Sequence, residues 1–223
     1  MKDRLLNKPS EIQTRAEIPT NPKRRRFIQT ALAMPLLFAL PAQTFAGTGI
    51  HKLQGDVFIN NRRASAESRI RAGNRIVVAH DGELTFSIGQ DAFLLKGGSA
   101  VELVGGTTLS SLRLLTGSVL ASLETRSRPF HLVSSMAIVA VRGGAVYLSA
   151  EPHRLYTWTR YGESELRFGR QRQAVSANDT AYEIVRDSAG MTMQSMQVNE
   201  QMDDELRMLE SLVGRTPAFD AEP

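Results

Sequence analysis

The sequence contains no cysteine among its 223 residues. Disulfide bonds, thiolate metal centres, a cysteine nucleophile and a lipid-modified cysteine are therefore excluded. Aromatic residues make up only 6% of the chain, with a single tryptophan. After residue 46 no apolar run reaches the length of about 18 residues that a membrane-spanning helix needs, so no stable span is expected there. Hydrophobic residues still make up 42%, which is enough for a folded core.

The positive charge is unevenly distributed along the chain. The whole sequence has a formal net charge of +4, with 27 Lys and Arg against 23 Asp and Glu. Residues 1–46 hold 8 of the basic residues and 3 of the acidic ones, so the remainder carries a net charge of about −1. Without a cationic field on the main part of the chain, nucleic acid is not an expected partner.

The N-terminal segment has the order of an export signal. Four basic residues at 23–26 come before an apolar run at 27–45, and the run ends in a small-residue triplet that closes at Ala46. Polar and proline residues interrupt the run, which makes it a poor membrane helix. This order predicts a signal peptide that is cleaved after Ala46.

Arg24, Arg25 and Phe27 resemble the bacterial twin-arginine consensus, in which two arginines stand shortly before Phe and a weakly hydrophobic stretch. We therefore expect residues 1–46 to be a twin-arginine-like export signal and the mature protein to be periplasmic. A general secretory signal and an uncleaved anchor are the alternatives that the sequence leaves open.

Short apolar runs separated by glycine-containing turns follow over residues 47–185. Alternation with period two is clear in residues 83–88, where Leu, Phe and Ile share one face. Asp81-Gly82 between two such runs predicts a tight hairpin. We expect an all-β domain over 47–185, either a sandwich or a solenoid-like stack of short strands, because no helical pattern intervenes.

Residues 186–223 form a C-terminal extension in which the periodicity changes. One amphipathic helix is expected at about 199–213, with Asn199 as N-cap, Gly214 as C-cap and an ion pair between Asp203 and Arg207. Its apolar stripe consists of Met202, Leu206, Leu209 and Val213.

The sequence shows none of the common catalytic motifs. The four histidines stand apart, and no phosphate-binding loop, nucleophile elbow, zinc-binding helix motif or dinucleotide fingerprint occurs. We therefore expect no catalytic residues, no metal site, no cofactor and no enzymatic activity. An unrecognised hydrolase whose active site is assembled from distant strands is the remote alternative.

Several segments resemble elements of the FecR domain of bacterial envelope proteins, and they follow one another in the same order as in that family. Residues 55–61 resemble the family's opening Gly-x-Val-x-Val-Asn-Gly, and residues 137–144 resemble its Ala-x-Val-x-Val-Arg-Gly-Thr. Further segments that resemble family elements are residues 70–76, 81–86, 112–120 and 130–134. The resemblance covers about half of the chain. Gly144 stands where the family has Thr, and residues 156–162 lack the cysteines that some single-domain relatives carry.

Better known FecR proteins relay an iron-transport signal to a cytoplasmic sigma factor. Only 26 residues precede the apolar run here, so we expect no cytoplasmic sigma-binding domain and no complete transmembrane relay. The resemblance implies a periplasmic FecR-like binding and regulatory module that acts through protein–protein contact.

Tyr156, Trp158 and Arg160 are the first candidates for partner binding. Alternation places them on one face of a strand and Tyr161 on the other. Tyr, Trp and Arg are enriched in binding hot spots. The structural alternative is cross-strand packing, with Arg160 over an aromatic ring.

Arg142 is the fourth candidate, since it stands in an apolar stretch immediately before Gly143-Gly144. The glycine pair predicts a bulge or a close backbone approach. The arginine side chain then either pairs with an internal carboxylate or faces a partner.

Two main classes of partner follow from these features. The first is an envelope protein, recognised through a strand edge or a sheet face. The second is a cell-wall glycan, in which case the protein is structural or carbohydrate-associated and its aromatic residues stack on sugar rings. The sequence leaves the oligomeric state open.

Overall fold

The computed structural model describes residues 47–175, 179–198 and 202–220. The predicted export signal, with Arg24, Arg25, Phe27 and Ala46, and the predicted N-cap Asn199 lie outside these ranges. No helix within the described ranges is long and apolar enough to cross a membrane.

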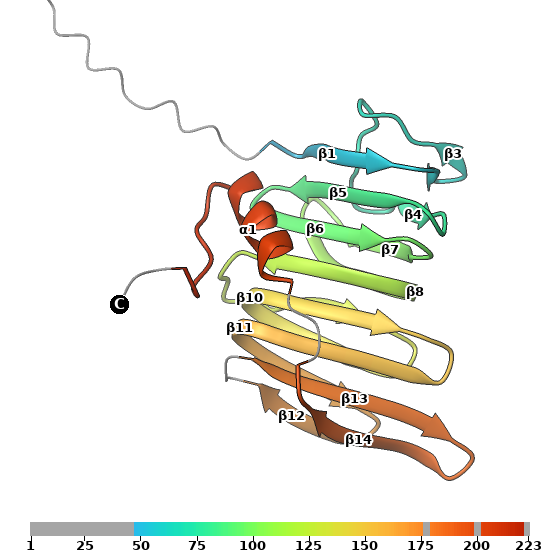
Figure 1. Cartoon of the computed structure of the whole chain (residues 1–223), viewed down its shortest axis with the longest axis vertical. Helices are drawn as coiled ribbons and strands as arrows, with labels where there is room; N and C mark the ends of the chain where they lie inside the picture. Colours follow the sequence, from blue (N-terminus) through green and yellow to red (C-terminus); the bar gives the residue numbers. More distant parts are fainter. Residues whose placement is uncertain (1–46, 176–178, 199–201, 221–223) are drawn as a thin grey trace, which may run out of the picture. The chain divides into compact units, whose positions relative to one another are not determined.

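The described residues form fourteen strands and one C-terminal helix (Figure 1), which confirms the predicted all-β class. The elements are β1 (Gly49–Gln54), β2 (Val57–Ile59), β3 (Arg62–Arg63), β4 (Arg75–Val78), β5 (Glu83–Ile88), β6 (Asp91–Lys96), β7 (Ala100–Gly105), β8 (Leu109–Leu123), β9 (Phe130–Val133), β10 (Ile138–Ala150), β11 (Arg154–Phe168), β12 (Gln171–Val175), β13 (Thr180–Asp187), β14 (Gly190–Met196) and α1 (Asp203–Leu212).

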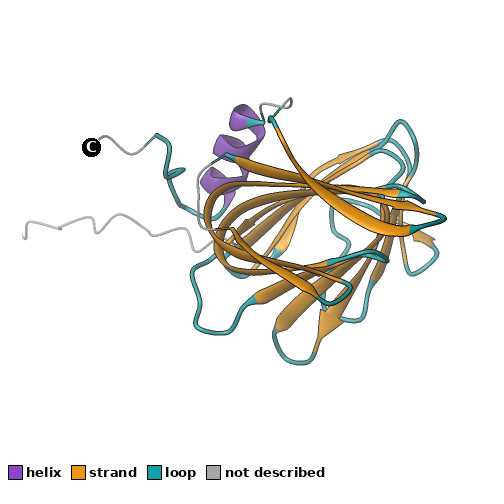
Figure 2. Ribbon diagram, turned by 90° about the horizontal axis from the view of Figure 1, so that it is seen from below, coloured by secondary structure: helices purple, strands orange, loops and turns teal. Residues whose placement is uncertain are grey.

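The strands form one mixed sheet that folds over on itself into two layers (Figure 2). The first layer has the order β1-β5-β6-β8-β10-β11-β13-β14. The second has the order β3-β2-β4-β7-β8-β9-β10-β11-β12, in which β8 and β9 are parallel. Because β8, β10 and β11 run through both layers, the fold is closer to a sandwich than to a solenoid.

Paired glycines allow β10 and β11 to bend from one layer into the other. Gly144 lies opposite Gly162, and their φ angles are +114° and +96°. A Cβ on Gly144 would lie 2.1 Å from the carbonyl oxygen of Tyr161, and one on Gly162 would lie 2.0 Å from that of Gly143. The strand register also shifts between Val141 and Gly143. The predicted bulge and close backbone approach at Gly143-Gly144 are confirmed.

The predicted hairpin at Asp81-Gly82 is wrong. The strand before it, β4, pairs with β2 and β7, whereas β5 pairs with β1 and β6. The turn therefore connects the two layers. A 3.0 Å hydrogen bond from the Gly82 amide to the Ala79 carbonyl closes it. Ile76 and Phe86 are buried in the same core. Strands on opposite sides of that core can both bury their apolar faces, which favours the crossing over a flat hairpin.

The main core fills the space between the layers. Phe86 and Phe93 of the first layer stack with ring centroids 5.0 Å apart, and Phe130 of the second layer lies 5.9 Å from Phe93. A smaller apolar cluster lies between the outer surface of the first layer and α1. One sheet thus buries apolar residues on both faces of its first layer.

Helix α1 begins at Asp203 and ends at Leu212, within the predicted range of 199–213. Met202 is in the N-cap position, so the prediction of Asn199 as N-cap is wrong. The four residues of the helix's predicted apolar stripe are all buried against the first layer. Gly214, with a φ of +68°, follows the last turn as expected of a C-terminal glycine. The predicted pair of Asp203 with Arg207 is wrong, because Asp203 faces the sheet and pairs with Arg160. Arg207 instead pairs with Asp204 and Asp220.

Candidate functional site

Three of the four predicted binding residues lie together on β11. Tyr156, Trp158 and Arg160 all point from the first layer toward the side of the molecule that α1 covers. Arg142 lies apart from them, exposed on the outer face of the second layer. The structure therefore divides the predicted site between two opposite faces.

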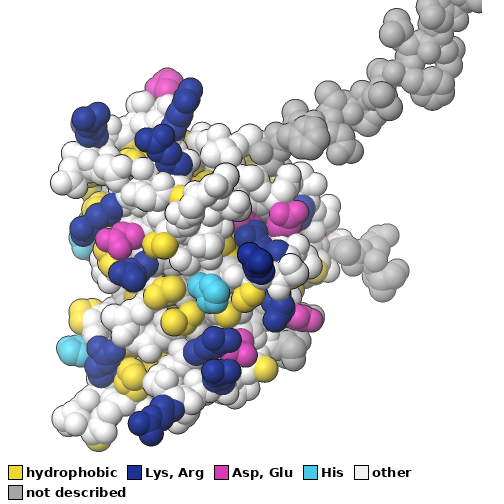
Figure 3. Space-filling model, turned by 180° about the vertical axis from the view of Figure 1, so that it is seen from behind, with side chains coloured by type: hydrophobic (Ala, Val, Ile, Leu, Met, Phe, Trp, Pro, Cys, Tyr) yellow, Lys and Arg dark blue, Asp and Glu magenta, His cyan; other side chains and the backbone are white. Residues whose placement is uncertain are grey.

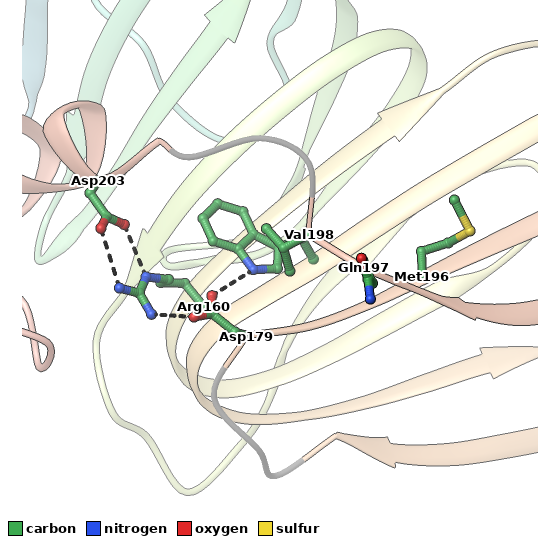
Figure 4. A pocket seen from close by; sticks show the side chains of 7 residues that line it. Arg160, Asp179, Met196, Gln197, Val198 and Asp203 are labelled. Atoms are coloured by element: carbon green, nitrogen blue, oxygen red, sulfur yellow. Dashed lines mark hydrogen bonds and ion pairs between the residues drawn. The ribbon is translucent and has the colours of Figure 1, made fainter.

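Arg160 links three separate parts of the chain (Figure 4). Its Nε donates to Asp203 Oδ1 at 2.9 Å and its Nη2 to Oδ2 at 3.2 Å, while its Nη1 donates to Asp179 Oδ2 at 2.8 Å. The other oxygen of Asp179 accepts a hydrogen bond from Trp158 Nε1 at 3.2 Å. The hydrogen bond to Asp203 raises the pKa of Arg160. This network fastens the start of α1 to β11 and to the residue before β13.

Phe219, near the C-terminus, completes the cluster. The Arg160 guanidinium lies 4.4 Å from the centroid of the Phe219 ring, and the Tyr161 ring lies 6.0 Å from it. Arg160 thus lies over an aromatic ring, as in the structural alternative, but the ring comes from the C-terminal segment and not from a neighbouring strand. The stacking partner is a residue that sequence periodicity along the strand could not indicate.

The predicted orientation of Tyr161 is wrong because β11 contains a bulge. Ala145 pairs with Tyr161 and Val146 with Thr159, which leaves Arg160 as the extra residue. A bulge shifts the alternation by one residue and places Tyr161 on the same side as Trp158. The Tyr161 hydroxyl donates to Glu210 Oε1. Burial, followed by this hydrogen bond, raises the pKa of Tyr161, so the phenol is a neutral donor at physiological pH.

Glu210 is the central acceptor of a buried network beneath α1. The residue is only 2% exposed. It accepts hydrogen bonds from the Ser122 hydroxyl of β8 at 2.8 Å and from Arg215 Nε at 2.6 Å. Arg215 also donates to the Gln90 carbonyl. Because a guanidinium balances this buried carboxylate, the network can hold the helix against the sheet without leaving an unpaired charge.

A cavity of about 400 Å³ lies beside Trp158 and Arg160. Met196, Gln197 and Val198 line it together with Asp179 and Asp203 (Figure 4). Its charged groups are already paired with one another. The Trp158 side chain is only 1% exposed, so its ring offers little surface to a ligand. Partner binding by Tyr156, Trp158 and Arg160 stays a prediction that this arrangement does not test.

Within the described ranges the helix α1 packs against the first layer, and no helix covers the outer face of the second layer. Figure 3 shows the molecule from this side, where Lys and Arg side chains lie among hydrophobic ones. This outer face carries all four large hydrophobic side chains that are prominently exposed in these ranges. They are Phe58, Val104, Leu115 and Ile138, between 36% and 44% exposed. Each follows or precedes a core residue along its strand, so alternation directs it to the outside.

Strand register aligns a row of side chains across seven strands of this face. We call these residues the arginine row: Arg75, Glu102, Arg113, Val133, Ile138, Arg167 and Arg172, each directly paired with the next. The row contains four arginines and one glutamate. Arg113 lies 3.8 Å from Glu102, and Arg167 pairs with Glu165 in the adjacent row. Arg75 and Arg172 have no ion pair among the described residues.

Arg142 belongs to the same outer face. Its Nη1 donates to the Ser127 carbonyl at 2.7 Å, and within the described ranges it has no carboxylate partner. It lines a cavity of about 220 Å³ together with Glu163, Glu165 and Arg167. The predicted pair with an internal carboxylate is not found among the described residues. Partner binding by Arg142 itself stays a prediction.

Sequence reasoning missed the arginine row. Alternation within each strand does indicate which of its residues point outward. The row, however, joins residues from 75 to 172, and the strand order that brings them together is not visible in the local pattern. The net charge of the residues after 46 does not indicate the arginine row either, because acidic residues in α1 offset its arginines.

Comparison with solved structures finds two crystal structures of a candidate anti-sigma factor from Parabacteroides distasonis ATCC 8503. Their sequence identities to this chain are 15% and 14%, and both have a TM-score of 0.49. Each alignment covers 55% of this chain and 60% of that chain, less than two thirds of its length. Similarity at this level is too weak to assign a family or a function. No protein-family model and no curated protein matches the chain.

Proposed function

We propose that this chain is a non-enzymatic regulatory module of the bacterial cell envelope that acts by binding another envelope protein. The observation that carries the proposal is the arginine row, which lies with exposed apolar side chains on a sheet face that no described helix covers. Arginine and large apolar residues on one surface are the composition of protein–protein interfaces. Uncovered apolar side chains on a sheet face also indicate an interaction surface.

The chemistry of the row favours a partner with an acidic surface that also carries apolar residues. Four arginines against one glutamate attract carboxylates, and Val133 and Ile138 at the centre of the row can pack against apolar groups. A glycan partner, bound by aromatic stacking, has less support because the Trp158 ring is buried.

The proposed location is the periplasm, reached by the twin-arginine route. Support comes from the basic segment at 23–26 and the apolar run at 27–45. Replacing Arg24→Lys and Arg25→Lys together preserves the charge but removes the pair that this export system reads. We expect the doubly substituted protein to accumulate inside the cell as measured by fractionation, whereas normal export would eliminate the twin-arginine route.

In-cell crosslinking tests the binding surface directly. A photo-crosslinking residue at Ile138, in the centre of the arginine row, should capture an envelope protein, and the same residue at Asp204, which is exposed on α1, should not. Replacing Arg113→Glu and Arg172→Glu should abolish capture through 138. The matched pair Arg113→Lys and Arg172→Lys keeps the charge and should retain most of it.

Three results would contradict the proposal. Capture from 204 but not from 138 would place the contact on the helix side. Capture that persists after both arginines become glutamate would show that charge on this face is irrelevant. Crosslinked material found only in the polysaccharide fraction would replace the protein partner with a glycan.

A further inference from the structure

Four of the described strands pair on one side only, and β14 differs from the other three. These strands are β1, β3, β12 and β14. Lys52 lies in β1, β3 consists of two arginines, and Arg172 lies in β12. β14 is the longest of the four and contains no charged residue and no proline. Natural sheet edges are normally protected by such residues, so β14 is an unprotected edge.

The backbone of β14 is regular enough to receive another strand. All seven of its residues pair with β13, from Asp187 opposite Gly190 to Ala181 opposite Met196, with no break in register. In an antiparallel pair, half of the N–H and C=O groups of an edge strand point away from its neighbour. Within the described ranges, β14 makes no backbone hydrogen bond to any segment other than β13.

The side chains of β14 divide between two faces. Met191 and Met193 are half-buried against the main core between the layers. Thr192 and Gln194 are exposed on the opposite face, where Gln194 donates to Glu183 at 2.7 Å. A neighbouring strand with apolar residues on its inner face would therefore extend the core beyond Met191 and Met193.

We propose that two copies of this chain associate by antiparallel pairing of β14 with β14. A second copy supplies a strand of equal length with methionines on its inner face, so each core would continue into the other. Neither strand carries a charge, so the symmetric pair places no like charges opposite each other. The pairing is isologous and occupies the one uncharged edge among the described strands, so it stops at a dimer. This contact is separate from the arginine row.

The oligomeric state of the protein isolated from its host tests this pairing. Sedimentation should show a reversible monomer–dimer equilibrium, because a seven-residue ladder is small beside a standard interface of about 1,600 Å². Replacing Thr192→Lys and Gln194→Lys brings four positive charges together in the dimer and should weaken association about tenfold or more. The matched control, Gln171→Lys with Ala174→Lys, replaces two exposed residues of the edge strand β12 and should leave association unchanged.

Hydrogen exchange locates the contact independently. Amides of residues 190–196 should become more protected as concentration rises in the wild-type protein and in the β12 control, but not in the β14 variant. Both lysines of the β14 variant replace exposed residues, so an unchanged thermal midpoint is expected and verifies the fold. A protein that stays monomeric at all concentrations, or a dimer that the β14 lysines leave intact, would overturn the proposal.

Discussion

Replacement of Trp158 by alanine tests whether this residue belongs to the interior. Its side chain is 1% exposed, and it packs among the residues between the first layer and α1. A buried tryptophan removes about 200 Å² from water, worth about 5 kcal/mol at 25 cal/mol per Å². Alanine retains part of that area, and Asp179, half exposed, can replace the lost indole hydrogen bond with water. We therefore expect a loss of about 4 kcal/mol, within the range for large aromatic residues.

Denaturant unfolding, followed by circular dichroism, measures this loss, and the thermal midpoint should fall by about 10 °C. Leu115→Ala on the uncovered face is the matched control, because its side chain is 40% exposed and its loss should cost less than about 1 kcal/mol. A loss below about 1 kcal/mol for Trp158→Ala, together with loss of partner capture, would refute the burial argument and restore Trp158 as a binding residue.

Two further predictions concern the positions that bend and fasten β11. The pKa of Tyr161 is higher in the folded than in the unfolded protein, where it is about 10, so its contribution to stability is complete below pH 10 and is lost as the pH rises from there through the folded pKa. Tyr161→Phe should flatten that part of a stability–pH curve. An unchanged curve would show that the titration of Tyr161 makes no contribution to the pH dependence of stability. Gly162→Ala places a Cβ 2.0 Å from the Gly143 carbonyl at a φ of +96° and should cost more than about 3 kcal/mol, whereas Gly106→Ala, with open space around it, should cost less than about 0.5 kcal/mol. Equal thermal midpoints for the two alanine variants would contradict the close backbone approach.

The amino-acid sequence was sufficient to predict the structural features that depend on local periodicity. Alternation of apolar and polar residues predicts the strands, and the spacing of Met202, Leu206 and Leu209 predicts the helix and the face that it buries. The bulge at Gly143-Gly144 was also predictable, because glycine within a strand often marks a bulge or a close approach of another backbone segment. Such features follow from interactions between residues close together in the chain.

Only the tertiary structure decided which strands are neighbours and what covers each face. Asp81-Gly82 crosses between layers because both adjoining strands bury apolar residues in one core. Trp158 is buried because α1, more than forty positions later in the chain, folds back over it. The arginine row exists because strand pairing aligns seven residues between positions 75 and 172 on a face that no described helix covers. These outcomes depend on competition among distant segments for the same apolar surface. Local sequence patterns do not predict which segment covers that surface in the folded protein.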